Sequence, residues 1–149
     1  MRIEGMRIEE ISKKDHEEAL KLVLSVFMKY EAPDYSEQGI QTFKEFITNQ
    51  ESINMLKIYG AFVENKIAGV IATRNNGNHI SLFFVDGKYH RHGIGRKLFE
   101  YILPKSTGEK ITVNSSPYAV EFYRKLGFRP DSGEQITDGI RFTPMTYMK

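Results

Sequence analysis

A short cationic segment at residues 88–97 (KYHRHGIGRK) carries the residue types with the most evident chemical potential in this chain. It follows an apolar stretch, His79–Val85, that predicts a strand, and it leads into a helical pattern. The first N–H groups of a helix have no intrahelical partner and carry a partial positive charge, so an anion is stabilised there. Gly93 and Gly95 let the backbone approach such a ligand because neither has a side chain. The segment therefore predicts a cradle for an anionic group.

Two well-known phosphate-binding motifs fit this segment poorly. The run Gly93-Ile94-Gly95 lacks the third glycine of a dinucleotide-binding turn, and no glycine in the chain is followed by Lys and then Ser or Thr, as a P-loop requires. A solvated basic helix start is a further alternative, because charged residues usually lie on the surface. On this segment alone, an anion site and a solvated surface both stay open.

Length and composition favour one domain with a core of its own, since 40% of the 149 residues are hydrophobic. A net charge of +2 is too small to predict nonspecific binding to nucleic acid. The absence of cysteine excludes disulfides, thiolate metal sites and a cysteine nucleophile, and the four histidines lack the paired spacing of metal ligands. No apolar run approaches the roughly 20 residues that cross a bilayer. We therefore expect a cytoplasmic protein without a metal or a membrane partner.

The sequence on either side of this segment alternates between strand and helix patterns. The expected strands are residues 6–11, 55–63, 67–74, 79–85, 110–114, 128–137 and 140–147. The expected helices begin at a Ser12/Asp15 capping pair and end at residues 32–34, then cover residues 36–48, run from Ile94 to Pro104, and run from the Ser116 N-cap to Gly127. The order is βααβββαβαββ in one mixed α/β unit. The MRIE of residues 1–4 recurs at residues 6–9, which coincidence and an alternative start at Met6 explain equally well.

Two motifs in this order resemble the GNAT superfamily of acyl-CoA-dependent N-acyltransferases, and the resemblance covers nearly the whole chain. The first is LFFV at residues 82–85 followed by HRHGIGRKLFEYIL, which is similar to the acyl-CoA signature of that family, with His90 in place of the usual Gln or Arg. The second is VNSSPYAVEFYRKLGF at residues 113–128, which is similar to the family's strand, asparagine and tyrosine-bearing helix. The resemblance implies a GNAT-like fold, with a central, mostly antiparallel, twisted sheet that splays between two strands and is flanked by about four helices. Those two strands would be His79–Val85 and residues 110–114.

The resemblance also implies a binding site for acetyl-CoA as a co-substrate. Its pyrophosphate would contact the N–H groups of residues 92–97, and its pantetheine arm would run along residues 82–85 as an added strand does at a sheet edge. The residues implied in acetyl-CoA binding are Phe83, Phe84, Val85, His90, Arg91, His92, Gly93, Ile94, Gly95, Arg96, Lys97, Asn114, Ser116 and Tyr123.

For catalysis, the resemblance implies direct attack of an amine on the thioester with both substrates bound together. Tyr123 would donate a proton to the departing thiolate, and the alternative for Tyr123 is an aromatic side chain packed in the core beside Tyr118 and Phe122. A backbone N–H near Phe84 or Val85 would stabilise the oxyanion.

The general base stays open at this stage. Glu31, Asp34, His79 and Asp86 are candidates by position, because an alkyl ammonium has a pKa near 10 and must lose a proton before it attacks. Glu31 and Asp34 belong to the segment between the first two helices, which lines the acceptor site in this family, and Tyr30 and Tyr35 would add aromatic walls.

The expected function is acetyl transfer from acetyl-CoA to an amine on a small molecule or a protein. The alternative is a CoA-binding regulatory module without turnover. A basic domain for nucleic acid is the weakest interpretation, since no extended basic face accompanies the segment. The edge of the C-terminal strand could pair or exchange in a homodimer, and the sequence leaves the oligomeric state open.

Overall fold

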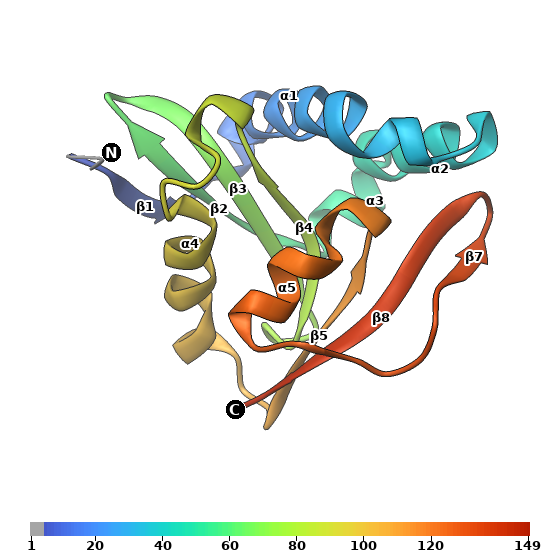
Figure 1. Ribbon diagram of the computed structural model, residues 1–149. Coiled ribbons are helices and arrows are strands. Elements are labelled where there is room, and N and C mark those ends of the chain that lie inside the picture. The colour runs from blue at the N-terminus through green and yellow to red at the C-terminus, as the bar shows by residue number, and fades with distance from the viewer. Residues whose placement is uncertain (1–4) are drawn as a thin grey trace.

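A computed structural model describes residues 5–149 as one twisted sheet with helices on both faces (Figure 1). Residues 1–4, and with them the first MRIE copy, lie outside the described part. The strands are β1 (Arg7–Glu10), β2 (Lys57–Val63), β3 (Lys66–Arg74), β4 (His79–Val85), β5 (Lys110–Ser115), β6 (Arg129–Pro130), β7 (Gln135–Thr137) and β8 (Ile140–Met148). They are ordered β1-β2-β3-β4-β5-β8-β6, and β7 pairs with β8. The pairing is antiparallel except between β4 and β5. The mixed α/β fold and its mostly antiparallel sheet are as expected.

Five α-helices cover the sheet in two layers. They are α1 (His16–Val26), α2 (Glu37–Thr48), α3 (Gln50–Asn54), α4 (Ile94–Ile102) and α5 (Val120–Leu126). One apolar cluster joins α1, α2 and α3 to one face of the sheet through residues such as Val23, Ile47 and Leu82, whereas a second joins α4 and α5 to the other face through Leu98 and Leu126. None of the helices within residues 5–149 is long and apolar enough to span a bilayer.

The parallel pair β4–β5 is short, and this opens the sheet. Only His79 pairs with Thr112 and Ile80 with Val113, after which the two strands diverge. From residue 81 to residue 85, the edge of β4 that faces β5 has no strand beside it. The splay expected from the resemblance is therefore present, and it leaves backbone groups of β4 free to pair with an extended ligand.

A β-bulge sits at the base of this opening. Ala72 pairs with Leu82 and Thr73 with Ile80, so Ser81 is an extra residue in β4. As a result, Ile80 packs in the cluster under α4 while Leu82 packs in the cluster under α1. A bulge re-aims the side chains around it and strengthens the local twist.

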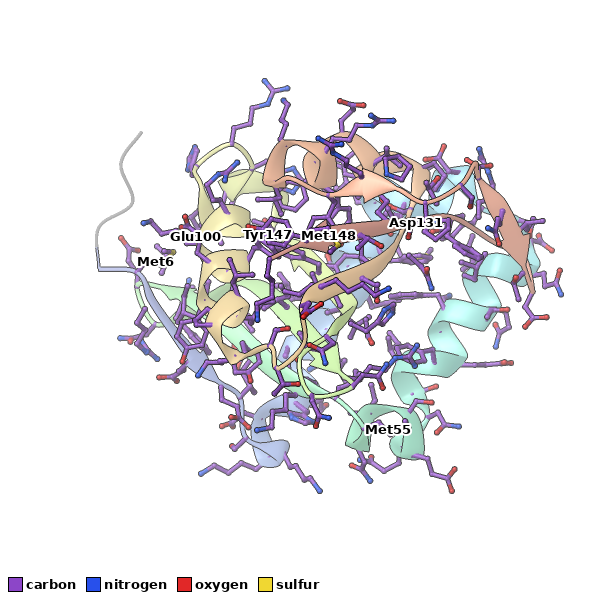
Figure 2. All side chains as sticks on the ribbon, turned by 90° about the horizontal axis from the view of Figure 1, so that it is seen from below. Met6, Met55, Glu100, Asp131, Tyr147 and Met148 are labelled. Carbon is purple, nitrogen blue, oxygen red and sulfur yellow. The ribbon has the colours of Figure 1, made fainter. Side chains whose placement is uncertain are left out.

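The expected strand over residues 128–137 is wrong, because a loop divides it into β6 and β7. Asp131, labelled in Figure 2, is the last residue held to β8 before this loop: its amide donates to the carbonyl oxygen of Pro144 at 2.8 Å, and its carboxylate accepts from Thr146 Oγ1 at 2.8 Å. The chain returns at β7 to form a hairpin with β8. The local apolar pattern did not indicate these bonds, which only the neighbouring strand makes possible.

Helix α3 was not expected. Asn49 ends α2 and caps the next helix, since its Oδ1 accepts from the Ser52 amide at 3.0 Å. At the end of that helix, Met55 is 65% exposed at the molecular surface (Figure 2), so strand β2 begins two residues later than expected.

Two predicted caps also differ in their chemistry. The Ser12 hydroxyl donates to the Asp15 carboxylate at 3.2 Å rather than capping a helix, and one 3-10 turn precedes α1. Ser116 begins a similar turn before α5, and its Oγ has no hydrogen-bond partner among residues 5–149. Its hydroxyl nevertheless lies near the Glu31 carboxyl and partly offsets the rise that burial causes in the pKa of that group.

Candidate active site

Two cavities meet at the opening between β4 and β5. The first, here called the cationic cavity, has a volume of about 550 Å³ and is bordered by β4, by the start of α4 and by α5. The positive side chains around it are Arg91, Arg96 and Lys125, so an anion in this cavity would be attracted from several sides.

The free amides of the cradle are fewer than expected. The His92 amide donates to the Tyr89 carbonyl oxygen at 3.2 Å, and the Lys97 amide donates to the Gly93 carbonyl oxygen at 3.1 Å. Both donors are therefore used within the chain. By helix geometry, the amides of residues 94–96 in the first turn of α4 have no carbonyl partner and remain for an anion.

Two glycines shape this end of the cavity in different ways. Gly93 has a φ of +83° as the N-cap of α4, and a Cβ there would meet nothing within 4 Å. A Cβ at Gly95 would lie 2.7 Å from Cζ of Phe122, so α5 can approach α4 closely only with glycine at this position. Gly93 thus leaves open space for a ligand, and Gly95 lets the wall beside that space pack closely.

The residue that departs from the family signature, His90, is bonded to the end of β4. Its Nε2 lies 2.7 Å from the carbonyl oxygen of Val85, which requires Nε2 to carry the proton. The ring also packs against Tyr30, with centroids 4.9 Å apart, and Tyr30 in turn stacks on Tyr118 at 5.4 Å. His90 thereby closes the loop over the end of β4.

The second cavity, here called the aromatic cavity, has a volume of about 300 Å³ and lies under α2 and the β7–β8 hairpin. Phe27 stacks on Phe43 with centroids 3.8 Å apart, and Tyr35 and Phe84 complete this part of the wall. Tyr35 thus borders this cavity, whereas Tyr30 borders neither cavity and packs beside His90 instead.

Glu31 borders both cavities, at the place where they join. Burial raises the pKa of its carboxyl from 4.5 to about 7; the nearby Ser116 hydroxyl opposes this rise and the negative charge of Asp34 adds to it. A carboxylate with a pKa near neutrality can accept a proton and release it again at physiological pH. Glu31 thus has the position and the acidity of a general base.

Local chain geometry explains this placement. The expected first helix continues past Val26 as a wider π-helical segment, Phe27–Glu31, and a 3-10 turn with Pro33 then ends it. A π-helical segment shifts the side chains that follow it away from the α-helical positions, and such segments are frequent at functional sites. Phe27 is buried while Glu31 reaches the cavities.

The three other base candidates are placed less favourably. Asp34 borders neither cavity, and Asp86 holds the amide of Lys88 at 3.1 Å. His79 lies in the aromatic cavity, where burial and the charge of Arg74 lower its pKa to about 4, and its Nδ1 contacts Thr112 Oγ1 at 2.8 Å. A ring with such a low pKa is a poor proton acceptor at pH 7.

Tyr123 borders the aromatic cavity and is only 5% exposed. Its ring meets Phe83 with centroids 6.0 Å apart and Phe128 at 5.3 Å, so it also packs in the core. Burial, and secondarily the charge of Glu31, raises the pKa of its phenol, so the hydroxyl stays protonated. The same shift makes the phenol a weaker acid, so Tyr123 combines core packing with a protonated hydroxyl beside the aromatic cavity.

The structure brings most of the expected acetyl-CoA residues to these cavities. Of these expected residues, the ones that border the cationic cavity are Phe83, Phe84, Val85, His90, Arg91, Gly93, Ile94, Gly95 and Arg96. Asn114, Ser116 and Tyr123 border the aromatic cavity instead, together with Phe83 and Phe84. His92 and Lys97 border neither.

Sequence reasoning missed Lys125, Arg74 and Ser81. Lys125 belongs to the second motif, but only the packing of α5 beside α4 brings it to the cationic cavity. Arg74 and Ser81 border the aromatic cavity through the β3–β4 pairing and its bulge, for which the sequence carries no local signal. Within residues 5–149, no group of three or more His, Asp or Glu side chains could hold a metal ion.

A family model described as an acetyltransferase (GNAT) domain matches residues 31–149. The chain belongs to the GNAT acetyltransferase family. Over 63 residues it is 33% identical to the peptidyl-lysine N-acetyltransferase YjaB of Salmonella typhimurium, a match that covers 42% of this chain and 43% of that relative. The chain thus matches less than half the length of this curated relative.

Solved structures show the same GNAT fold over the whole chain. A GCN5-related N-acetyltransferase from Rhodopseudomonas palustris superposes with a TM-score of 0.82 at 17% identity, covering 100% of this chain and 99% of that one. The PaiA N-acetyltransferase from Thermoplasma acidophilum, solved in complex with coenzyme A, gives 0.71 at 21% identity over 97% and 99% of the two chains. The splayed β4–β5 pair is therefore part of a GNAT fold.

Proposed function

We propose that this chain transfers an acetyl group from acetyl-CoA to a primary amine, and that residues 1–149 form one domain for this reaction. The observation that carries the proposal is the position of Glu31. Its carboxyl, with a pKa of about 7, borders the cationic cavity and the aromatic cavity where they join. A base at that junction would lie between a donor in one cavity and an acceptor in the other.

The cationic cavity suits the donor. The first-turn amides of α4, with Arg91, Arg96 and Lys125, would hold the pyrophosphate. The open edge of β4 would pair with the amides of the pantetheine arm. The structurally similar PaiA N-acetyltransferase was solved in complex with coenzyme A, which supports this choice of donor.

Each step of the reaction then has a group on this chain. Glu31 takes a proton from the acceptor ammonium, and the neutral nitrogen attacks the thioester carbonyl carbon. A backbone N–H near Phe84 or Val85 stabilises the developing oxyanion, a contribution of about 3 kcal/mol. The carbon–sulfur bond breaks as Tyr123 donates a proton to the sulfur. The new amide nitrogen then gives up its extra proton, which returns to the Tyr123 phenolate, and Glu31 releases its proton to solvent.

Titration calorimetry with acetyl-CoA, followed by an assay of free thiol release with a panel of amines, tests this proposal. We expect one acetyl-CoA site per chain and thiol release that depends on the amine. The Glu31→Gln variant should bind acetyl-CoA normally and release thiol about 10²- to 10⁴-fold more slowly. A folded protein that binds no acetyl-CoA would contradict the proposal, and binding without turnover would favour the regulatory module instead.

A further inference from the structure

The inner end of the aromatic cavity holds polar groups that the proposed reaction does not use. Arg74 Nε and Ser81 Oγ are both buried, and neither has a hydrogen-bond partner within the described chain. Both residues border the aromatic cavity. A buried polar group without a partner costs roughly 1–3 kcal/mol, so such groups call for an explanation.

The neighbours of Arg74 do not supply a partner. Arg74 is the last residue of β3 and pairs with His79 at the start of β4. The His79 ring is already in contact with Thr112, and Arg74 takes part in none of the ion pairs formed by residues 5–149. Arg74 also borders a separate polar cavity near Glu10, but His79 and Ser81 do not. The aromatic cavity is thus the one that both Arg74 and Ser81 border.

The cavity thus has two chemically different ends with an apolar middle. Glu31 lies at the end that joins the cationic cavity, Arg74 and Ser81 lie at the other, and Phe43 and Phe84 lie among the apolar residues of the wall. Building on the function proposed above, we propose that the acceptor is a primary amine joined by an apolar spacer to a carboxylate, and that Arg74 and Ser81 bind this carboxylate. The amine would then point to Glu31 and the thioester.

The length of β4 sets the spacing of the two groups. Three strand steps separate Ser81 from Phe84, which borders both cavities as Glu31 does, and they cover roughly 10 Å. Even with the reach of the arginine side chain, an α-amino acid, whose amine and carboxylate share one carbon, is too short. A polyamine is also disfavoured, because its second ammonium would lie next to the positive charge of Arg74.

Three matched amines test the proposal in the thiol release assay. ε-Aminocaproate has the amine, an apolar chain and the carboxylate; hexylamine lacks the carboxylate; hexamethylenediamine replaces it with a second amine. We expect kcat/KM to be about 10- to 100-fold higher for ε-aminocaproate than for either of the others, since a hydrogen bond to a charged group is lost in those two. The Arg74→Gln variant should reduce this preference to less than about twofold, chiefly by lowering kcat/KM for ε-aminocaproate.

Several controls separate binding from folding. Arg129→Gln removes an exposed arginine from β6, outside both cavities, and should keep the preference. Arg74→Lys keeps the charge without the forked geometry of the guanidinium and should keep part of the preference for ε-aminocaproate. Ser81→Ala should weaken that preference less than Arg74→Gln does. Unchanged acetyl-CoA affinity in each variant shows that the fold is intact.

A similar kcat/KM for ε-aminocaproate and hexylamine, or a preference that survives Arg74→Gln, would overturn the inference while leaving acetyl transfer intact. If no amine in the panel is acetylated, titration calorimetry of ε-aminocaproate in the presence of CoA decides. Binding by the wild type that Arg74→Gln removes supports the carboxylate site, and absence of binding overturns it. Failure of the proposed function shows itself separately, as absence of acetyl-CoA binding.

Discussion

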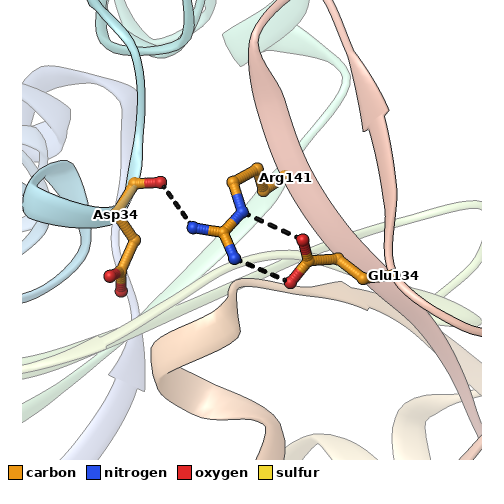
Figure 3. Close-up of polar contacts among 3 residues, drawn as sticks. All are labelled: Asp34, Glu134 and Arg141. Carbon is orange, nitrogen blue, oxygen red and sulfur yellow. Dashed lines mark hydrogen bonds and ion pairs between the residues drawn. The ribbon is translucent and has the colours of Figure 1, made fainter.

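Arg141 connects two segments that lie far apart in the sequence, because its Nη1 donates a hydrogen bond to the backbone carbonyl oxygen of Asp34 at 3.0 Å (Figure 3). Its Nε and Nη2 hold the Glu134 carboxylate at 2.9 and 3.1 Å. The β7–β8 hairpin is thereby fastened to the turn that follows Glu31. Thr42 Oγ1 adds a second connection, since it donates to the Asp138 carbonyl oxygen at 2.7 Å. Next to this hydrogen bond, the backbone of α2 at Gly39 touches the turn between β7 and β8 at Gly139. A Cβ at Gly39 would clash with the Gly139 carbonyl oxygen.

The Arg141→Gln variant should therefore loosen one wall of the aromatic cavity. We expect KM for the amine to rise roughly twofold to fivefold, because an exposed ion pair contributes little, while acetyl-CoA affinity stays the same. Steady-state kinetics with each substrate varied in turn measures the two effects. An equal loss of acetyl-CoA affinity would show that the hairpin supports the whole site rather than the aromatic cavity.

The pH dependence of kcat/KM should report the ionisation of Glu31. A base works only when deprotonated, so activity should rise with pH through about 7, the pKa that burial gives this carboxyl. Asp34→Asn removes a negative charge that helps to raise this pKa, so its rising limb should move to lower pH by less than about 1 pH unit. A rising limb that stays in place in Asp34→Asn, or one centred near pH 4.5, would assign the base to another group.

The Tyr123→Phe variant should lower kcat by about 10²- to 10⁴-fold and leave acetyl-CoA affinity nearly unchanged, because the ring still packs against Phe83 and Phe128. Tyr147→Phe is the matched control, since Tyr147 contacts Phe99 and Phe128 but borders neither cavity. Single-turnover thiol release measures the chemical step. Equal rates in the two variants would leave Tyr123 as a packing residue only.

Glu31 and His79 should make opposite contributions to stability against pH. Burial raises the pKa of Glu31 from 4.5 to about 7, so in this window the folded state holds a proton that the unfolded state releases, and stability falls as pH rises. Burial and Arg74 lower the pKa of His79 from 6.5 to about 4, so the unfolded state binds the extra proton and stability falls as pH drops through that window.

Between about pH 4.5 and 6.5 the two slopes oppose each other in the wild type. In the Glu31→Gln variant, the free energy of unfolding should therefore rise with pH across this range, by up to about 3 kcal/mol. In the His79→Gln variant, it should fall with rising pH by a similar or smaller amount. Urea denaturation across this range measures the slopes, which do not depend on the constant cost of losing the His79–Thr112 contact. Parallel slopes in the wild type and both variants would contradict this account.

The amino-acid sequence by itself determined the order of elements apart from α3 and the break between β6 and β7, and it predicted the anion cradle, because these depend on signals between near neighbours. Two glycines after an apolar strand, a proline after Ser116 and a glycine after Leu126 act within a few residues, and the alternating or helical spacing of apolar side chains selects strand or helix. The two GNAT-like motifs indicated the family, which the family match confirms, and with it the fold.

Tertiary structure decided what depends on residues far apart in the chain. The acidity of Glu31 comes from burial between two cavities, and Ser116 and Asp34 modulate it there. Residues 128–137 divide where the contacts of Asp131 with β8 end, and the β3–β4 pairing with its bulge brings Arg74 and Ser81 to the same cavity. Burial, cross-strand pairing and convergence on a cavity are properties of the packed chain, so no local pattern encodes them.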